Sequence, residues 1–240
     1  MSKVALIIET REHEALPFVI DSVMNQLDDD WKLQIFHGTG NANYVKRITN
    51  RKYFDRTITT NLGFDSLPQW PESNDLMVTE ALWEQCEGDT ILYFEADSMI
   101  CPNSNYKIGD FEHFDYIGGY WGNNIPDLNT EYTWVMNGGF SLRKKQYLLD
   151  CIKYKRADYL KHGGNECEDY FFSACLDKKP LVSEVLSFSI DNGYVAPVVG
   201  VPFGLHKPWG EIPAKGHGRA YNEIKEKCED VELLESLHNV

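Results

Sequence analysis

Residues 91–98 read ILYFEADS, so an apolar run ends in two carboxylates, Glu95 and Asp97. A short apolar run after the turn residues Gly88 and Asp89 is typical of a buried strand in an α/β sheet. Ligands of open α/β sheets bind at the carboxyl ends of the strands. Because residues i and i+2 of an extended chain point to the same side, we expect the two carboxylates to converge on one ligand.

Two carboxylates held close together repel each other unless a proton or a cation lies between them. Hard divalent ions such as Mg²⁺ and Mn²⁺ take oxygen ligands and are often shared with the phosphates of a substrate. Two acids that end a strand in solvent, or Asp97 capping a turn, would explain the same residues without a ligand. The apolar run that buries the chain up to the pair favours the metal.

The chain before this strand alternates between strand-like and helix-like patterns. Apolar or β-branched runs predict strands at 4–8, 33–36, 57–60 and 91–94. The spacing of apolar residues predicts helices at 16–27 and from 71–74 to Cys86, with a short helix within 38–56. This alternation favours a three-layer α/β/α sandwich, in which helices cover both faces of a mixed, mostly parallel sheet.

The second half of the chain is less regular and is rich in glycine and aromatic residues. We expect helices near 144–153 and 168–177, and a last amphipathic helix over 220–240. No repeat, low-complexity stretch or proline-rich linker divides the sequence, so we expect a single domain over 1–240.

The charge balance excludes several classes of function. The 240 residues hold 37 Asp and Glu against 23 Lys and Arg, a formal net charge of -14. A nucleic-acid-binding protein needs a cationic face, and an anionic membrane surface repels an acidic chain. No apolar run approaches the roughly 20 residues of a membrane-spanning helix. We therefore expect neither a nucleic-acid partner nor a membrane span.

The N-terminus and the cysteines bear on the compartment. The apolar run after Lys3 is too short for the core of a signal peptide. Cysteines are scattered along the sequence without a C-x-x-C pair, at positions 86, 101, 151, 167, 175 and 228. This spacing suggests neither a zinc site nor a disulfide framework. We expect reduced thiols and a soluble, cytoplasmic protein.

A second acidic cluster, NECED at 165–169, comes directly before the apolar residues 170–172. It reads as a helix start, with Asn165 as the N-cap and Glu168 three residues later. A carboxylate at a buried helix start is also well placed as a general base. Since adjacent side chains diverge and Glu168 fits the capping role, we assign the base to Asp169.

Two glycine pairs with aromatic neighbours are further candidates, in YIGGYWG at 116–122 and in VMNGGF at 135–140. Glycine lets the backbone approach a ligand closely, and aromatic faces suit sugar rings. Tight turns beside core aromatics explain the same residues equally well. Neither segment matches a phosphate-binding glycine motif.

The segment FGLHKPWG at 203–210 places His206 beside Lys207 in a stretch that reads as a loop. A lone histidine is more often structural than a ligand. Here a neutral imidazole could complete the shell of an Mg²⁺ or Mn²⁺ ion, and the lysine could pair with a phosphate.

Taken in order, the segments ILYFEADSMIC, DYIGGYWG, NGGFSLR, ECEDYFFS and FGLHKPW resemble those of GT-A fold glycosyltransferases. The nearest resemblance is to a poorly characterised glycosyltransferase family of bacteria, eukaryotes and large DNA viruses. It implies a nucleotide-binding half over 1–100, an acceptor and catalytic half over 101–219, and a C-terminal helix over 220–240. The implied partners are a nucleotide-sugar donor and a carbohydrate or other hydroxyl acceptor, with Mn²⁺ or Mg²⁺ as the cofactor.

The resemblance also implies roles for particular residues, because Glu95-Ala96-Asp97 stands where GT-A enzymes carry an Asp-x-Asp motif. The metal ligands would be Glu95, Asp97 and His206. The donor-binding residues would be Glu9, Thr10, Arg11, Thr79, Glu95 and Lys207. The sugar and acceptor pocket would be shaped by Trp121, Asn137, Gly138 and Gly139. The catalytic pair would be Asp169 and Glu168, with Asp169 as the base of an inverting transfer.

Alternatives remain open at this point. The His-Lys-Pro-Trp segment is similar to that of retaining enzymes, whereas the Glu168-Asp169 pair is similar to that of inverting ones. A sugar nucleotidyltransferase normally carries a glycine-rich loop after its first strand, where this chain has Glu9-Thr10-Arg11. A non-catalytic glycan-binding module would need no acid such as Asp169 beside a metal site. The chain is expected to be a monomer or a homodimer.

Overall fold

A mixed β-sheet forms the centre of the protein in the computed structural model, which describes residues 1–49, 52–67, 72–120, 135–164, 167–191, 200–209 and 218–238. Its strands are β1 Lys3–Ile8, β2 Trp31–His37, β3 Thr57–Asn61, β4 Thr90–Phe94, β5 Ser98–Ile100, β6 Tyr116–Tyr120, β7 Met136–Lys144, β8 Ser189–Asp191 and β9 Gly204–His206. They follow the order β3-β2-β1-β4-β7-β6-β8-β9-β5. Neighbours are parallel from β3 to β4 and from β6 to β9, while β7 and β5 run antiparallel to their partners.

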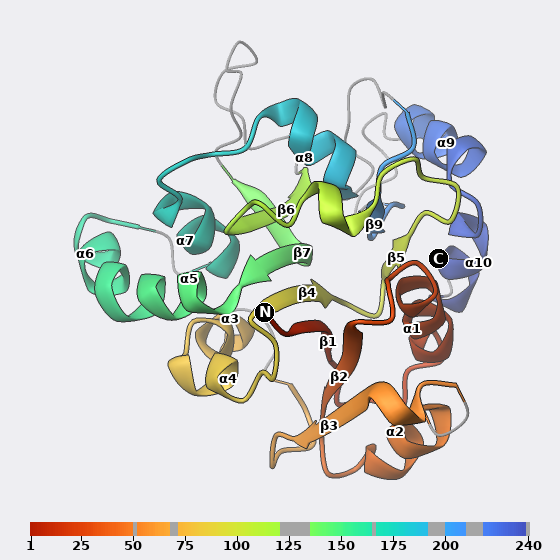
Figure 1. The fold of residues 1–240 in the computed structure, drawn as a ribbon, viewed down its shortest axis with the longest axis horizontal. Helices are drawn as coiled ribbons and strands as arrows, with labels where there is room; N and C mark the ends of the chain where they lie inside the picture. Colours follow the sequence, from red (N-terminus) through yellow and green to blue (C-terminus); the bar gives the residue numbers. More distant parts are fainter. Residues whose placement is uncertain are drawn as a thin grey trace.

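Helices connect these strands. They are α1 Leu16–Met24, α2 Ala42–Thr49, α3 Glu72–Met77, α4 Glu80–Glu84, α5 Lys145–Asp150, α6 Arg156–Lys161, α7 Glu168–Cys175, α8 Val182–Phe188, α9 Gly218–Lys227 and α10 Val231–Leu237. Figure 1 shows α1 and α2 on one side of the first strands, and α3 and α4 on the other side. The predicted three-layer arrangement around a mixed sheet is confirmed.

The apolar patterns in the first half of the chain fold as predicted. Every residue of β4 is buried, and Lys3 is the one β1 residue that is not. The apolar stripe of the helix predicted over 16–27 is buried from Leu16 to Leu27, although α1 itself ends at Met24. Each such side chain contributes about 1.5–3 kcal/mol relative to an exposed position. Strand and helix identity here follow from which residues can be buried.

Two predicted helices are interrupted, contrary to our expectation. The stretch from 72 to Glu84 breaks at Thr79, whose backbone is extended at φ -107° and ψ 136°. The C-terminal helix breaks at Asp230, which has a left-handed φ of 67°. Both glycine pairs also lie within strands, β6 and β7, rather than in tight turns. The apolar spacing does not reveal the breaks at Thr79 and Asp230, because the helices on both sides of each break bury apolar residues in the same core.

Two of the cysteines differ from the expectation of reduced thiols. Cys101 and Cys228 form a disulfide, with Cα atoms 5.2 Å apart, although 127 residues separate them. The remaining four cysteines, all within the described residues, form no disulfide. The sequence spacing could not indicate this pair, since only the fold brings α9 back to the segment that follows β5.

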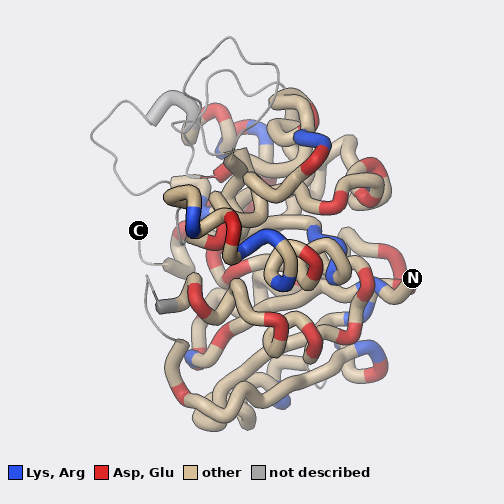
Figure 2. The backbone as a smooth tube through the Cα atoms, turned by 90° about the vertical axis from the view of Figure 1, so that its left-hand side faces the viewer, with Lys and Arg blue, Asp and Glu red and all other residues tan. Residues whose placement is uncertain are grey.

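Charges are spread widely over the molecule. Figure 2 shows Lys and Arg interspersed among Asp and Glu on the side it presents. Within the described part of the chain, no helix combines the length and the apolar character needed to cross a membrane.

Parallel pairing brings the carboxyl ends of β1, β2 and β4 to one edge of the sheet. Glu9 follows β1 and Glu95 follows β4, so the two acids lie at neighbouring strand ends. This edge is where an open α/β sheet binds its ligands.

Candidate functional site

Two carboxylates and one imidazole converge at this edge. Glu95 and Asp97 lie in the turn between β4 and β5, and His206 ends β9. Nε2 of His206 is 3.3 Å from a Glu95 oxygen and 3.2 Å from Oδ1 of Asp97. One ligand atom from each residue lies within 4.8 Å of the others. The carboxylates converge because the backbone turns, with Ser98 N–H donating to the Glu95 carbonyl at 3.1 Å, and not because it is extended as we expected.

A third carboxylate, Asp191 of β8, holds the other side of the imidazole. Its Oδ1 is 2.5 Å from Nδ1 of His206, and the Asp191 side chain is fully buried. Burial lowers the pKa of His206, but the charges of Asp97 and Asp191 outweigh it and raise that pKa well above its usual value. A carboxylate on the second nitrogen is the usual partner of a metal-bound histidine, because it fixes the ring and leaves Nε2 for the metal.

The cluster fits a hard divalent cation. Oδ1 of Asp97 is buried and accepts no hydrogen bond from the residues that the structure describes, since its 3.2 Å ion-pair contact with Nε2 of His206 lacks hydrogen-bond geometry. Burial raises the pKa of Asp97, but the opposite effect of His206 is larger, and the pKa falls to about 2. Two carboxylates and an imidazole form a donor set that suits Mn²⁺ or Mg²⁺. A cation between these residues would satisfy the Asp97 oxygen and replace the proton that His206 otherwise holds.

The glycine pair at the start of β7 lets the two acidic clusters approach each other. A Cβ on Gly139 would collide with the ring of His206, and one on Gly138 would lie 2.5 Å from Glu168 Oε1. The Gly139 carbonyl accepts hydrogen bonds from Glu95 N–H and from Ser98 Oγ, both at 3.0 Å. The pair therefore joins the metal cluster to the start of α7.

Asp169 and Glu168 begin α7 and are both buried. Gly138 N–H donates to Oδ1 of Asp169 at 2.7 Å, and the Asn137 amide lies 3.4 Å from Oδ2. Burial, followed by the charge of Glu168, raises the pKa of Asp169 well above its usual value. A carboxylate with a raised pKa is suited to accept a proton near neutral pH.

Arg143 of β7 is the buried cation beside this pair. Its guanidinium is 3.4 Å from Glu168 Oε1 and donates to the Gly138 carbonyl at 3.0 Å. It is surrounded by aromatic rings at centroid distances of 4.8 to 5.9 Å, those of Trp83, Tyr93, Tyr116 and Phe172. Burying a charge is costly unless it is paired. Arg143 therefore pairs with Glu168, and its charge also lowers the pKa of Asp169, although burial and the charge of Glu168 outweigh that effect.

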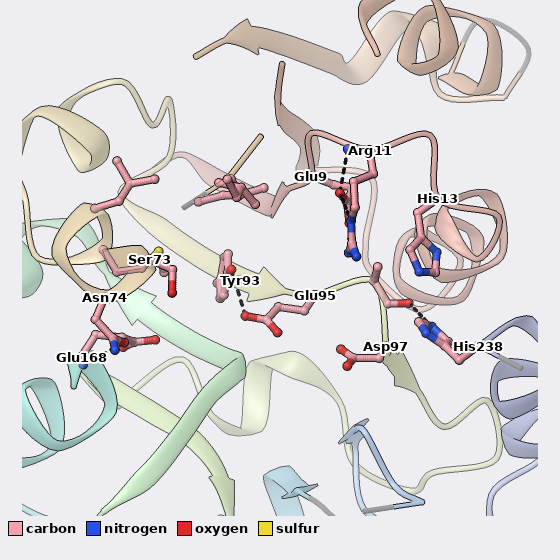
Figure 3. A pocket seen from close by; sticks show the side chains of 15 residues that line it. Glu9, Arg11, His13, Ser73, Asn74, Tyr93, Glu95, Asp97, Glu168 and His238 are labelled. Carbon is pink, nitrogen blue, oxygen red and sulfur yellow. Dashed lines mark hydrogen bonds and ion pairs between the residues drawn. The ribbon is translucent and has the colours of Figure 1, made fainter. Parts of the chain in front are cut away.

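A cavity of about 330 Å³ lies against Glu95, Asp97 and Glu168, whereas His206 and Asp169 lie behind these residues and are not among its lining residues. Figure 3 shows Asn74 and Glu168 at one end, Arg11 and Asp97 towards the other, and Glu95 between them. Both ends are polar, and the volume is in the range of small-molecule sites, about 300–1,000 Å³.

Glu9 holds Arg11 at the edge of this cavity. The Arg11 guanidinium donates to both Glu9 oxygens, at 2.9 and 2.7 Å, and the Arg11 N–H donates to the first at 2.8 Å. Hydrogen bonding to Glu9 raises the pKa of Arg11, and the charges of Asp97 and Glu95 raise it further. Arg11 is thus a fixed positive charge close to the acidic cluster.

The remaining predicted site residues lie less directly at the cavity. Thr10 accepts the Leu67 N–H at 3.1 Å, and Thr79 donates to the Leu76 carbonyl at 2.8 Å. Lys207 has a left-handed φ of 44°, and its N–H donates to the Asp97 carbonyl at 2.9 Å. None of these three residues is among those that line the cavity. Trp121 lies outside the described residues.

Several residues at the site were not foreseen from the sequence. Asp191 gave no signal, because one acid at the end of a three-residue strand is ordinary. Arg143 was not singled out either, because no strand was predicted at 136–144 and one arginine there is ordinary. Tyr93 lies in the decisive stretch itself, and its hydroxyl donates to Glu95 Oε1 at 3.2 Å. His13 and His238 also line the cavity, although they are far apart in sequence.

The fold is similar to that of solved glycosyltransferases. The galactosyltransferase LgtC, in complex with donor and acceptor sugar analogs, is similar at a TM-score of 0.53 and 14% identity, over 96% of this chain and 99% of that chain. GlyE of Streptococcus pneumoniae is similar at 0.53 and 9% identity, over 100% of this chain and 63% of GlyE. A TarS fragment of S. aureus with UDP-GlcNAc gives 0.42 and 17% identity, and this chain covers 52% of it. The likeness to LgtC confirms the GT-A fold.

No curated protein compared with this chain matches it in sequence. A family model does match, over residues 57–206, which include the Glu95-Ala96-Asp97 turn, the glycine pairs and His206. Because this match covers more than half of the 240 residues, the chain belongs to the family described as "Protein of unknown function (DUF5672)".

Proposed function

We propose that this chain is a metal-dependent glycosyltransferase that moves a sugar from a nucleoside-diphosphate-sugar donor to a hydroxyl acceptor. The cluster of Glu95, Asp97 and His206 carries the proposal, since it lies beside a cavity at the carboxyl ends of parallel strands. The GT-A fold, shared with LgtC, supports the same reading.

The residues around the cluster fit the charge of a diphosphate. Glu95, Asp97 and His206 would hold Mn²⁺ or Mg²⁺, and Asp191 would fix the imidazole. The bound ion would supply Lewis-acid stabilisation of the charge that develops on the leaving diphosphate. Arg11, held by Glu9, adds a positive charge at the same edge of the cavity.

Asp169 is the proposed base of an inverting transfer. In this role it takes the proton of the acceptor hydroxyl as the oxygen attacks the anomeric carbon of the donor. Gly138 N–H and Asn137 hold its carboxylate in place, and burial raises its pKa towards the working pH. Glu168 lines the cavity with one oxygen bound by Arg143, so in this proposal it faces the sugar of the donor.

Release of nucleoside diphosphate tests this function. A panel of nucleotide sugars is incubated with the protein and Mn²⁺, with water as the hydroxyl that receives the sugar and with a chelator control, and free nucleoside diphosphate is measured. We expect release from one class of donor, lost on chelation and in Asp97→Asn. Asp158→Asn is the matched control, because it alters an exposed acid of α6 that does not line the cavity, and it should release nucleoside diphosphate as wild type does.

Two alternative functions give different products. A sugar nucleotidyltransferase would release pyrophosphate from a nucleoside triphosphate and a sugar phosphate. A glycan-binding module would bind sugars and release nothing. Either result in place of nucleoside diphosphate would contradict the proposal.

A further inference from the structure

The C-terminal end of the described chain lies at the proposed donor cavity. His238, directly after α10, lines this cavity together with Arg11 and His13. Its ring centroid is 4.7 Å from that of His13 and 5.1 Å from that of Trp209. Its Nε2 is 3.0 Å from the carbonyl oxygen of Ala96, the middle residue of the Glu95-Ala96-Asp97 turn. Figure 3 shows His238 beside Asp97 and facing His13.

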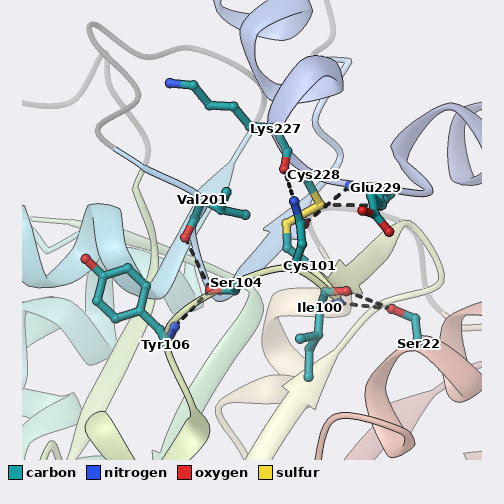
Figure 4. The surroundings of a disulfide bond; sticks show 10 residues. Ser22, Ile100, Cys101, Ser104, Tyr106, Val201, Lys227, Cys228 and Glu229 are labelled. Atoms are coloured by element: carbon teal, nitrogen blue, oxygen red, sulfur yellow. Dashed lines mark hydrogen bonds between the residues drawn. A yellow bond between two sulfur atoms is a disulfide. The ribbon is translucent and has the colours of Figure 1, made fainter.

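The helices that carry His238 are fastened to the segment that follows the same turn. The Cys101–Cys228 disulfide joins α9 to this segment. Asn103 adds two hydrogen bonds, donating from Nδ2 to the Lys227 carbonyl at 2.5 Å and accepting from Glu229 N–H at 3.5 Å. Figure 4 shows the disulfide between Cys101 and Cys228, with Lys227 and Glu229 beside it. With the contact to Ala96, every one of these anchors falls within residues 96–103.

The cavity needs such a wall for an anionic ligand. Among the described lining residues, Arg11, His13 and His238 are the basic ones, and Figure 3 places them together at the Asp97 end. A nucleoside diphosphate carries its negative charge on its phosphates. In the bound state the phosphates would lie between the three basic residues and a cation held by Asp97. Nitrogen-rich side chains at this end therefore match the phosphate end of the donor.

We propose that the C-terminal helices form a disulfide-tethered wall of the donor cavity, in which His238 contributes to nucleoside diphosphate binding. The inference rests on the proposed function and adds a binding residue outside the motifs that suggested it. It makes donor affinity depend on the disulfide, because this bond is the covalent anchor of two short helices that otherwise hold their position through buried residues such as Ile224, Val231 and Leu234. A dithiol reductant, which supplies two electrons and two protons, converts the bond into two thiols and removes the covalent anchor.

Calorimetric titration with nucleoside diphosphates tests this wall. UDP and GDP are titrated, each with Mn²⁺, into wild type, His238→Ala and His162→Ala. His162 is an exposed histidine of the loop after α6 that pairs with Asp158, so it serves as the matched control. Loss of one hydrogen bond and its ring contacts should weaken the Kd of His238→Ala about ten-fold, while His162→Ala should match wild type.

The role of the disulfide is read from the same titration after treatment with a dithiol. Reduction should weaken binding several-fold in wild type but cause little further loss in His238→Ala, because the tether acts through His238. An equal loss in both proteins would show that the disulfide supports only the fold, and would overturn the coupling. His238→Phe, which keeps a ring between His13 and Trp209 but cannot donate to Ala96, should also bind more weakly and covers the case in which His238→Ala does not fold.

The outcomes separate this inference from the proposed function. Binding by wild type that His238→Ala and His238→Phe both retain would overturn the inference and leave the proposed function standing. A wild type that binds no nucleoside diphosphate would overturn both.

Discussion

Asp191 is the residue that fixes the orientation of His206. Its carboxylate meets Nδ1 inside the protein, so Nε2 faces Glu95 and Asp97. Partners of this kind typically contribute about 10- to 100-fold to metal affinity. Asp191→Asn should therefore weaken Mn²⁺ binding by that factor while the ligands remain, and Asp97→Ala should weaken it more. Mn²⁺ binding measured by electron paramagnetic resonance checks this. An unchanged Mn²⁺ affinity in Asp191→Asn would show that Asp191 does not support the metal site.

Asp169 should have opposite effects on stability and on activity. Because its pKa is raised in the folded protein, the folded state binds the proton more tightly than the unfolded state. Its contribution to the free energy of unfolding therefore falls as the pH rises from about 4 through the raised pKa. Asp169→Asn lacks this penalty, so it should be more stable than wild type at neutral pH and lose the advantage near pH 4.

The activity of the same variant separates a base from a structural acid. If Asp169 accepts the acceptor proton, Asp169→Asn should lose kcat by far more than donor affinity. Urea unfolding at several pH values and steady-state kinetics check the two halves. Intact kcat with weakened donor binding would contradict the base role.

At the scale of elements, β7 links the metal cluster to α7 through two glycines. A Cβ on Gly139 would collide with the His206 ring, so Gly139→Ala should move the imidazole. We expect Mn²⁺ binding to weaken at least about ten-fold, which is the low end of the effect of losing a residue that orients a metal ligand. Gly109→Ala is the matched control, because a Cβ there meets nothing within 4 Å. Equal Mn²⁺ affinity in the two variants would show that β7 does not position His206.

The sequence predicts helices and strands well where their buried residues form a regular pattern along the chain. The strands 4–8 and 91–94 and the helix from Leu16 were predictable because apolar residues must be buried at a fixed period. The breaks at Thr79 and Asp230 were not, since the apolar spacing continues across both of them. Glu95 and Asp97 could be recognised from their place after a buried strand. Asp191, His238 and the Cys101–Cys228 bond depend on contacts between distant segments, which no local pattern encodes.

At the scale of the whole molecule, the acidic charge makes the metal decisive. A net charge of -14 should repel a nucleoside diphosphate, and the cavity itself is lined by Glu9, Glu95, Asp97 and Glu168. Arg11 is paired with Glu9, so a divalent cation would be the main source of positive charge for the phosphates. Donor binding should therefore depend on the metal more strongly than in a protein with a basic cavity.

Thermal unfolding of the protein with a panel of nucleotide sugars, with and without Mn²⁺, tests this account most directly. A ligand of the folded state present at about 100 times its Kd adds about 2.7 kcal/mol to the free energy of unfolding. For a chain of this length, that raises the Tm by about 5–10 °C. We predict such a rise for one class of nucleotide sugar with Mn²⁺, and none without the metal or in Asp97→Ala. No rise with any nucleotide sugar, or an equal rise without Mn²⁺, would contradict it.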